Sequence, residues 1–317
     1  MKPCGFALVE TLIALLLGLV LLAAIVATLA SGRQTHADNE HLARAQEAAR
    51  TALALLAGEA RNAGHYGLAW PGTPIAGATP AGLAEPAGLT VAGRCIPSLA
   101  LDLGTPIAAA DGTYALDAHH TLGCAPGPGG RAAAGSDTLT LRRVATLPSP
   151  AEAGRLQLES TPGGGRLLTD GRRSGPATSR LTDVEVGAFY ISADSSLGRG
   201  RPSLRRKRLV GGAMSAMQDE ELVPGIADLQ VEFGLDRHDD DDRAIDAWVD
   251  AGTAAPGSDL RALRLWVLAE SDEPDGRPVA ATPLRYANRE FVPPDDRRRR
   301  VLVMTTVWLR NVAEPAP

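Results

Sequence analysis

The pattern of apolar and polar positions is most uniform near the start of the chain. The residues from Leu12 to Ala30 form a charge-free apolar run of 19 residues. At about 1.5 Å of rise per helical residue this run covers roughly 28 Å, close to the ~30 Å hydrocarbon core of a bilayer. Its length therefore predicts a membrane-spanning helix.

One acidic residue, Glu10, lies at the beginning of this apolar region. An unpaired carboxylate within a membrane costs about 2.5–3.5 kcal/mol on insertion scales, so Glu10 needs a specific partner. A secretory signal peptide would have an apolar core of only about 7–15 residues, and a passive anchor would have no need of the acid. A third possibility is cleavage after Gly5, which would free the amine of Phe6 to neutralise the carboxylate.

Ser31 and Gly32 mark a weak point where the helix could be interrupted, and helical periodicity returns after them. The apolar residues recur at intervals of three and four, which predicts an amphipathic helix with one apolar stripe: Leu42, Ala45, Ala49, Leu53, Leu56 and Ala60. Glu40 and Arg44 form an i,i+4 pair on the polar side, and Gly64 is a suitable C-terminal stop. We expect one long helix or two nearly continuous ones, packed on a globular head.

The remainder of the chain divides by composition. Residues 65–136 are rich in Pro, Gly and Ala and predict loops with short strands. Beyond residue 136, alternating and β-branched segments predict seven strands: Thr138–Val144, Arg155–Glu159, Val184–Ser192, Leu204–Val210, Ile226–Gly234, Leu263–Ala269 and Val301–Leu309. These strands indicate a mostly antiparallel sheet, or a pair of sheets, against the helix.

The charges of the chain bear on its partners and on its orientation in a membrane. The formal net charge of -5 argues against nucleic acid as an obligatory partner. Lys2 precedes the apolar run, and the charge of Arg33 after the run is offset by nearby acids. This balance favours a cytoplasmic N-terminus and an exported head.

The cysteine content suggests one disulfide. Cys4 precedes the cleavage point, which leaves Cys95 and Cys124 as an even pair. An oxidising compartment favours a disulfide between them over two free thiols.

Taken together, Gly5-Phe6, Glu10 as the fifth residue after the cut and the unbroken apolar helix resemble the type IV prepilin signal of pilins and pseudopilins. The resemblance implies that a prepilin peptidase cleaves after Gly5 and methylates the new terminal residue, Phe6. It also implies that the helix is first an inner-membrane anchor and later part of a filament core. In that core Glu10 would pair with a terminal amine.

The last third of the sequence resembles a subfamily. The segments Leu222–Gly234, Arg261–Glu270 and Val301–Asn311 are similar, in this order, to strands of PilW-type minor pilins and of the related J-class minor pseudopilins of type II secretion. The chain departs from that pattern at residues 64–68, where members often carry a cysteine and none is present here. The resemblance implies an α+β, pilin-like fold with a long helix on a β-rich head.

These expectations give a domain division and a function. The division is a leader at 1–5, a transmembrane and filament-core helix at 6–30, an amphipathic continuation at 31–64, a loop region at 65–136 and a periplasmic head at 137–317. The resemblance implies a minor pilin that primes pilus assembly near the tip, with other minor pilins and the major pilin as partners and a large tip-associated protein as a further candidate. A type II secretion pseudopilin and a membrane-anchored periplasmic binding module remain alternatives.

Other candidate chemistry is sparse. The acidic run around Asp236, Asp240 and Asp242 is a calcium candidate, but its spacing does not fit an EF-hand loop and a solvated turn is the expectation. The adjacent His119 and His120 have no matching ligand cluster, so we expect a loop. No motif for a catalytic nucleophile, a phosphate loop or a metalloprotease is present, and we expect neither an enzyme nor a cofactor.

Two basic runs raise the question of DNA binding. They are Arg205–Arg208 and Arg297–Arg300. A strand would send the charges of the first run to both faces, and no aromatic residues are interleaved for base stacking. DNA is therefore not expected as a partner, and protection of an exposed sheet edge is the preferred interpretation of these charges.

Overall fold

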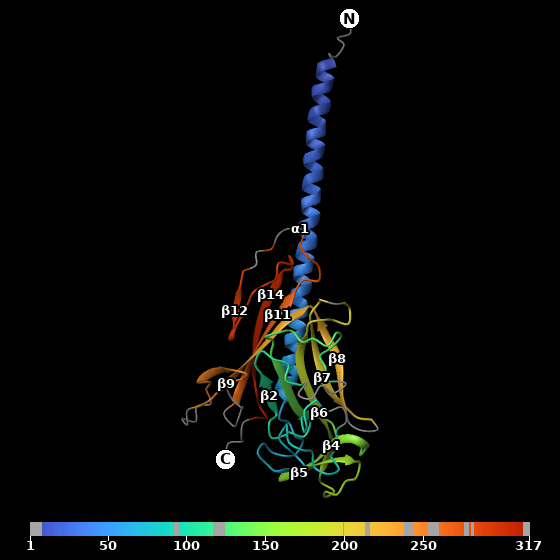
Figure 1. Cartoon of the computed structure of the whole chain (residues 1–317), viewed down its shortest axis with the longest axis vertical. Helices are drawn as coiled ribbons and strands as arrows, with labels where there is room; N and C mark the ends of the chain where they lie inside the picture. The colour runs from blue at the N-terminus through green and yellow to red at the C-terminus, as the bar shows by residue number, and fades with distance from the viewer. Residues whose placement is uncertain are drawn as a thin grey trace.

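In the computed structural model, one long helix carries a head of two main β-sheets, as Figure 1 shows. The description covers residues 8–312, with gaps at 90, 92–94, 117–123, 199, 213–215, 238–243, 253–259, 276–278 and 280–281. The helix, α1, runs from Leu8 to Asn62 without interruption at Ser31 or Gly32. Its first half extends away from the head and its second half lies against it.

Gly64 ends the helix for a conformational reason. Its φ of 79° lies in the left-handed region, and its backbone N–H donates to the carbonyl of Arg142 on the head. A side chain at this position would meet the backbone carbonyl of Asn311 at 2.5 Å. Gly64 therefore permits both the helix stop and the close approach of two distant chain segments.

The larger sheet has eight strands. Its main path has the order β1 (Ile75–Ala76), β5 (Gly164–Asp170), β4 (Ala153–Thr161), β6 (Arg180–Ser192), β3 (Thr138–Val144) and β2 (Ile107–Ala110), with β7 (Ser203–Val210) and β8 (Ala216–Pro224) attached through β6. Among its described strands, β1 and β5 pair in parallel and the other neighbours pair antiparallel. The long strand β6 pairs with β3, β4 and β7, and so joins the whole sheet.

The smaller sheet packs against α1. It has the order β10 (Ala247–Asp250), β9 (Ile226–Leu235), β11 (Leu260–Glu270) and β14 (Arg300–Trp308), all antiparallel. A separate hairpin is formed by β12 (Leu284–Tyr286) and β13 (Arg289–Phe291). The predicted arrangement of antiparallel sheets against a stalk helix is confirmed.

The apolar stripe of α1 supplies the core between helix and head. Ala45, Ala49, Leu56 and Ala60 are at most 3% exposed and pack with inward-facing residues of β9, β11 and β14. Alanine dominates this stripe because a small side chain lets the helix axis approach the sheet closely. Burial of this kind stabilises the contact at roughly 25 cal/mol per Å² of apolar surface.

The region 65–136 contributes more than loops. It forms a lobe with a second core, to which Leu99, Leu101, Leu103 and Leu116 contribute buried side chains. The buried guanidinium of Arg142 on β3 organises this lobe by donating from Nε to the carbonyl of Leu99 at 2.7 Å and from Nη1 to that of Thr105 at 2.6 Å. Burial lowers the pKa of Arg142, and the nearby Asp102 carboxylate opposes that effect.

Each of the seven predicted strands overlaps a strand of the structure. The prediction was wrong about β7, which is not an edge: β6 flanks it on one side and β8 on the other. Beyond residue 136 it also missed the short strands β10, β12 and β13 and the longer β5 and β8. The strand β5 begins with two glycines and β8 carries three consecutive acids, which hid both.

Candidate functional site

The free half of α1 is the most exposed apolar surface of the described chain. Every leucine, isoleucine and valine from Leu8 to Leu29 is at least 55% exposed, so the head covers none of them. By length and composition this helix can cross a membrane. The structure thus separates a bare apolar stalk from a compact head.

Glu10 lies in the first described turn of α1, at the end of the stalk farthest from the head. Gly5 and Phe6 precede the described residues, so the predicted cleavage point lies outside them. Immediately after Glu10, a shallow apolar groove follows the helix surface, lined by Thr11, Ala14, Leu15, Gly18, Leu19 and Leu22. The small residues in this lining, Thr11, Ala14 and Gly18, are of the kind that lets another helix approach closely in a membrane.

Ion pairs fix the other half of α1 to the head. Near the middle of the helix, His41 and Arg44 contact the carboxylate of Asp272 at 2.7 and 3.1 Å. Near its end, Glu59 accepts from Arg143 on β3 and Arg206 on β7. These contacts, spaced along about five turns, set the direction in which the stalk leaves the head.

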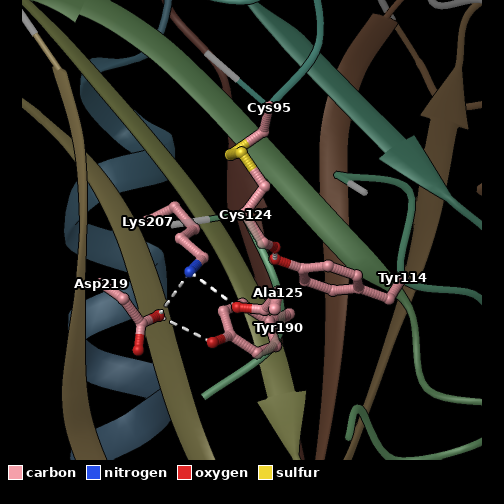
Figure 2. The surroundings of a disulfide bond; sticks show 7 residues. All are labelled: Cys95, Tyr114, Cys124, Ala125, Tyr190, Lys207 and Asp219. Carbon is pink, nitrogen blue, oxygen red and sulfur yellow. Dashed lines mark hydrogen bonds and ion pairs between the residues drawn. A yellow bond between two sulfur atoms is a disulfide. The ribbon is translucent and has the colours of Figure 1, made fainter. Parts of the chain in front are cut away.

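Cys95 and Cys124 form a disulfide with a Cα–Cα distance of 5.0 Å, buried in the lobe core. Figure 2 shows the buried polar groups beneath it. The hydroxyl of Tyr114 donates to the carbonyl of Cys124, and the ammonium of Lys207 donates to the carbonyl of Ala125 at 2.9 Å. The disulfide and these bonds together hold the segment after Cys124 on β7.

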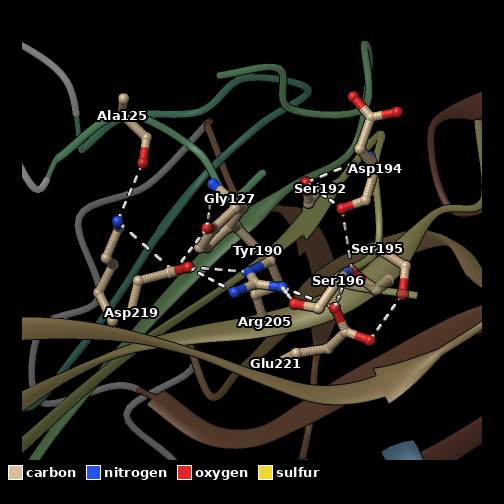
Figure 3. Close-up of polar contacts among 12 residues, drawn as sticks. Ala125, Gly127, Tyr190, Ser192, Asp194, Ser195, Ser196, Arg205, Asp219 and Glu221 are labelled. Carbon is tan, nitrogen blue, oxygen red and sulfur yellow. Dashed lines mark hydrogen bonds and ion pairs between the residues drawn. The ribbon is translucent and has the colours of Figure 1, made fainter. Parts of the chain in front are cut away.

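The ammonium of Lys207 lies 3.5 Å from the carboxylate of Asp219 (Figure 2), in a buried charge network between β7 and β8. Figure 3 draws Arg205, Asp219, Glu221 and Tyr190 of this network. Arg205 donates to Asp219 at 2.9 Å and to Glu221 at 2.7 Å, while the hydroxyl of Tyr190 donates to Asp219 at 2.7 Å. Two cations therefore face two carboxylates, which balances charge where water is largely excluded. Burial and the Asp219 carboxylate both raise the pKa of Tyr190.

This network was not predicted from the sequence, although the sequence contains a signal for it. Arg205, Arg206 and Lys207 lie opposite Glu221, Glu220 and Asp219 in the β7–β8 register. Two charge runs of opposite sign on either side of a Gly-Gly turn can be interpreted as two strands of a hairpin. The cations of the first basic run thus form ion pairs with the acids of β8, within the sheet, and do not protect a sheet edge.

The second basic run is also largely internal. Arg298 donates to the carbonyls of Ser271 and Asp272, Arg299 pairs with Asp275, and Arg300 pairs with Glu270 and Asp296. These contacts tie the start of β14 to the end of β11.

For the calcium candidates, the structure describes only Asp236. It accepts from Arg261 at 3.0 Å, whereas Asp240, Asp242, His119 and His120 lie outside the described residues. Within the part of the chain that the structure covers, no group of three or more His, Cys, Asp or Glu side chains could hold a metal ion.

Comparison with known proteins adds one finding on the head. No curated protein matches the chain. A type IV-like pilin from Thermus thermophilus is 13% identical, with a TM-score of 0.33, over 56% of this chain and 81% of that chain. Residues 188–311, which include the smaller sheet that packs on α1, match the family described as type IV pilus-assembly protein W.

Proposed function

We propose that this protein is a minor pilin that takes part in type IV pilus assembly. The observation that carries the proposal is the form of α1: one continuous helix has a bare apolar first half and a second half that bears the head. The match of residues 188–311 to type IV pilus-assembly protein W supports the same role.

In this proposal the chain is a single-pass protein of the inner membrane, with a cytoplasmic N-terminus and a periplasmic head. A prepilin peptidase cleaves after Gly5 and methylates Phe6. The helix then moves from the membrane into the filament, where Glu10 pairs with a terminal amine and sets the register of neighbouring helices. The protein acts structurally, near the tip, by priming assembly with other minor pilins and the major pilin, and a large tip-associated protein is a further candidate partner.

Mass spectrometry of the mature N-terminus tests processing directly. We expect a chain that begins at methylated Phe6. A mature protein that retains Met1 to Gly5 would instead favour a membrane-anchored binding module.

Substitution of Glu10 tests assembly. Glu10→Ala should leave insertion and cleavage intact while lowering incorporation into pili, because a passive anchor has no use for the carboxylate. The matched control is Glu47→Ala, which removes an exposed acid from the same helix. Normal piliation by the Glu10 variant would exclude the docking role.

A type II secretion pseudopilin is the second candidate, because the segment Leu222–Gly234 also resembles the J-class minor pseudopilins. Deleting the gene separates the two roles: loss of surface pili supports the first, and loss of protein secretion with intact pili supports the second.

A further inference from the structure

The strand β14 is the last strand of the smaller sheet and has an open edge. Among the described residues it pairs with β11 alone. The N–H of Leu309 donates to the carbonyl of Arg261, so the odd-numbered residues of β14 make the bonds to β11. The N–H and C=O groups of Leu302, Met304, Thr306 and Trp308 therefore point to the open side.

This edge lacks the devices that usually block strand addition. From Val301 to Leu309 it contains neither a charged residue nor a proline. The other edges differ: β8 carries Asp219, Glu220 and Glu221 and ends in Pro224, while β1, β2 and β10 have two to four residues. A long, uncharged edge strand is a template for pairing with another chain.

The side chains beside the open edge are apolar as well. Val307 faces α1 and is buried, whereas Met304 and Trp308 project from the opposite face and are 47% and 57% exposed. Two large apolar side chains thus lie next to a row of backbone groups that pair with no strand among the described residues. An extended segment with apolar residues at alternate positions would hydrogen-bond to these backbone groups and pack against the two apolar side chains.

The direction of β14 decides which chain can bind. Its start pairs with Glu270, next to the Asp272 that contacts His41 of α1, and Asn311 beyond its end donates to the carbonyl of Ala63. The strand therefore runs parallel to α1, as Figure 1 also shows.

This direction excludes the β14 edge of a second copy as the occupant, and the other described edges of such a copy are acidic or only two to four residues long. Pairing of the same edge in two copies requires an antiparallel arrangement about a two-fold axis perpendicular to the strands. The two α1 helices would then point in opposite directions. Two such helices cannot enter one membrane from the same side.

We propose that the open edge of β14 binds an extended strand from a different subunit of the same assembly, one whose stalk helix enters the same membrane. The partner strand continues the β10-β9-β11-β14 sheet and places apolar side chains against Met304 and Trp308. The inference rests on the proposed function, because it assumes that neighbouring subunits share the direction of α1.

The test uses full-length protein in cells that assemble pili. A photo-crosslinking benzoylphenylalanine at Met304 should give a product that mass spectrometry identifies as this chain joined to a different pilin-type subunit. Leu197 is 72% exposed on another part of the head and provides the control position. Benzoylphenylalanine in place of Leu197 should give at least tenfold less of the crosslinked product.

Backbone pairing is tested by Thr306→Pro in the crosslinking background. Proline removes an N–H that points to the open side and leaves the β11 ladder intact, so crosslinking should fall at least tenfold, while Thr306→Ala retains it. Formation of the Cys95–Cys124 disulfide reports correct folding. If the proline variant fails to fold, Thr306→Lys places a charge on the open edge and should give the same loss.

The outcomes separate this inference from the proposed function. A crosslinked homodimer, no product at Met304, or a product that both Thr306→Pro and Thr306→Lys leave unchanged would overturn the docking role of β14. If deletion of the gene leaves pili intact, the proposed function fails instead. Loss of pili on deletion with unaffected β14 variants overturns only the inference.

Discussion

Glu59 on α1 and Arg206 on β7 are 147 residues apart in sequence, and their carboxylate and guanidinium are 3.0 Å apart. The same carboxylate accepts from Arg143 on β3 at 3.1 Å. Arg206 and Arg143 in turn reach Glu220 and Glu185. A single side chain near the end of the helix therefore connects α1 to two strands of the larger sheet.

Replacing Glu59 should weaken the attachment of the helix to the head. Glu59→Gln leaves two arginines without their shared carboxylate in a site that is only about a quarter exposed. We expect the free energy of unfolding to fall by about 1–2 kcal/mol, more than for an exposed pair. Urea unfolding of the full-length protein in detergent measures it, and Glu47→Gln on the exposed side of α1 should change it by less than about 0.5 kcal/mol.

Two adjacent leucines of α1 give a matched comparison of packing. Leu56 is fully buried against the smaller sheet, and Leu55 is 42% exposed. Leu56→Ala should lower the free energy of unfolding by about 2–5 kcal/mol, because it removes buried contacts and leaves a cavity. Leu55→Ala should cost less than about 1 kcal/mol. Equal losses in the two variants would contradict the assigned face of the helix.

Much of the fold follows from periodicity. The stripe from Ala45 to Ala60 has the spacing of a helix face, and the alternation in Thr138–Val144 is that of a strand, so both could be predicted without tertiary information. The apolar run at the N-terminus likewise predicts the bare stalk. These patterns are local, since each repeats within one element.

The buried charge network could not be predicted in the same way. Lys207 is 1% exposed only because Ala125 and Asp219 come from separate segments to receive its ammonium. A lysine in a basic run ordinarily indicates a solvated surface. Nor does composition reveal that β14 ends a sheet, because an edge is defined by the absence of a neighbouring strand.

The disulfide should be a major source of stability for the lobe. It closes a loop with a sequence separation of 29, for which chain-entropy arguments give about 3–4 kcal/mol. Replacing both Cys95 and Cys124 by Ser should lower the unfolding midpoint of the head, and a reductant should destabilise the wild type but not this variant. An identical response of the two proteins to dithiothreitol would argue against a structural role for the bond.

Asp137 should make stability depend on pH. The residue is 2% exposed where β3 meets β9, and its carboxylate accepts from the N–H groups of Gly112 and Val231, both at 2.8 Å. Burial raises its pKa to about 7, with further contributions from the acids Asp111 and Asp228, although the two hydrogen bonds oppose the shift. The pKa of an unfolded aspartate is about 4, so the folded state binds the proton more tightly.

The sign of the effect follows from this difference. The contribution of Asp137 is most favourable below pH 4 and is lost as the pH rises to about 7, by up to about 4 kcal/mol for a shift of this size. Urea midpoints at pH 4.5 and 7.5 should show a smaller decline in Asp137→Asn than in the wild type. The control Asp295→Asn, at an exposed position, should keep the wild-type decline. The same decline in all three proteins would show that Asp137 titrates normally.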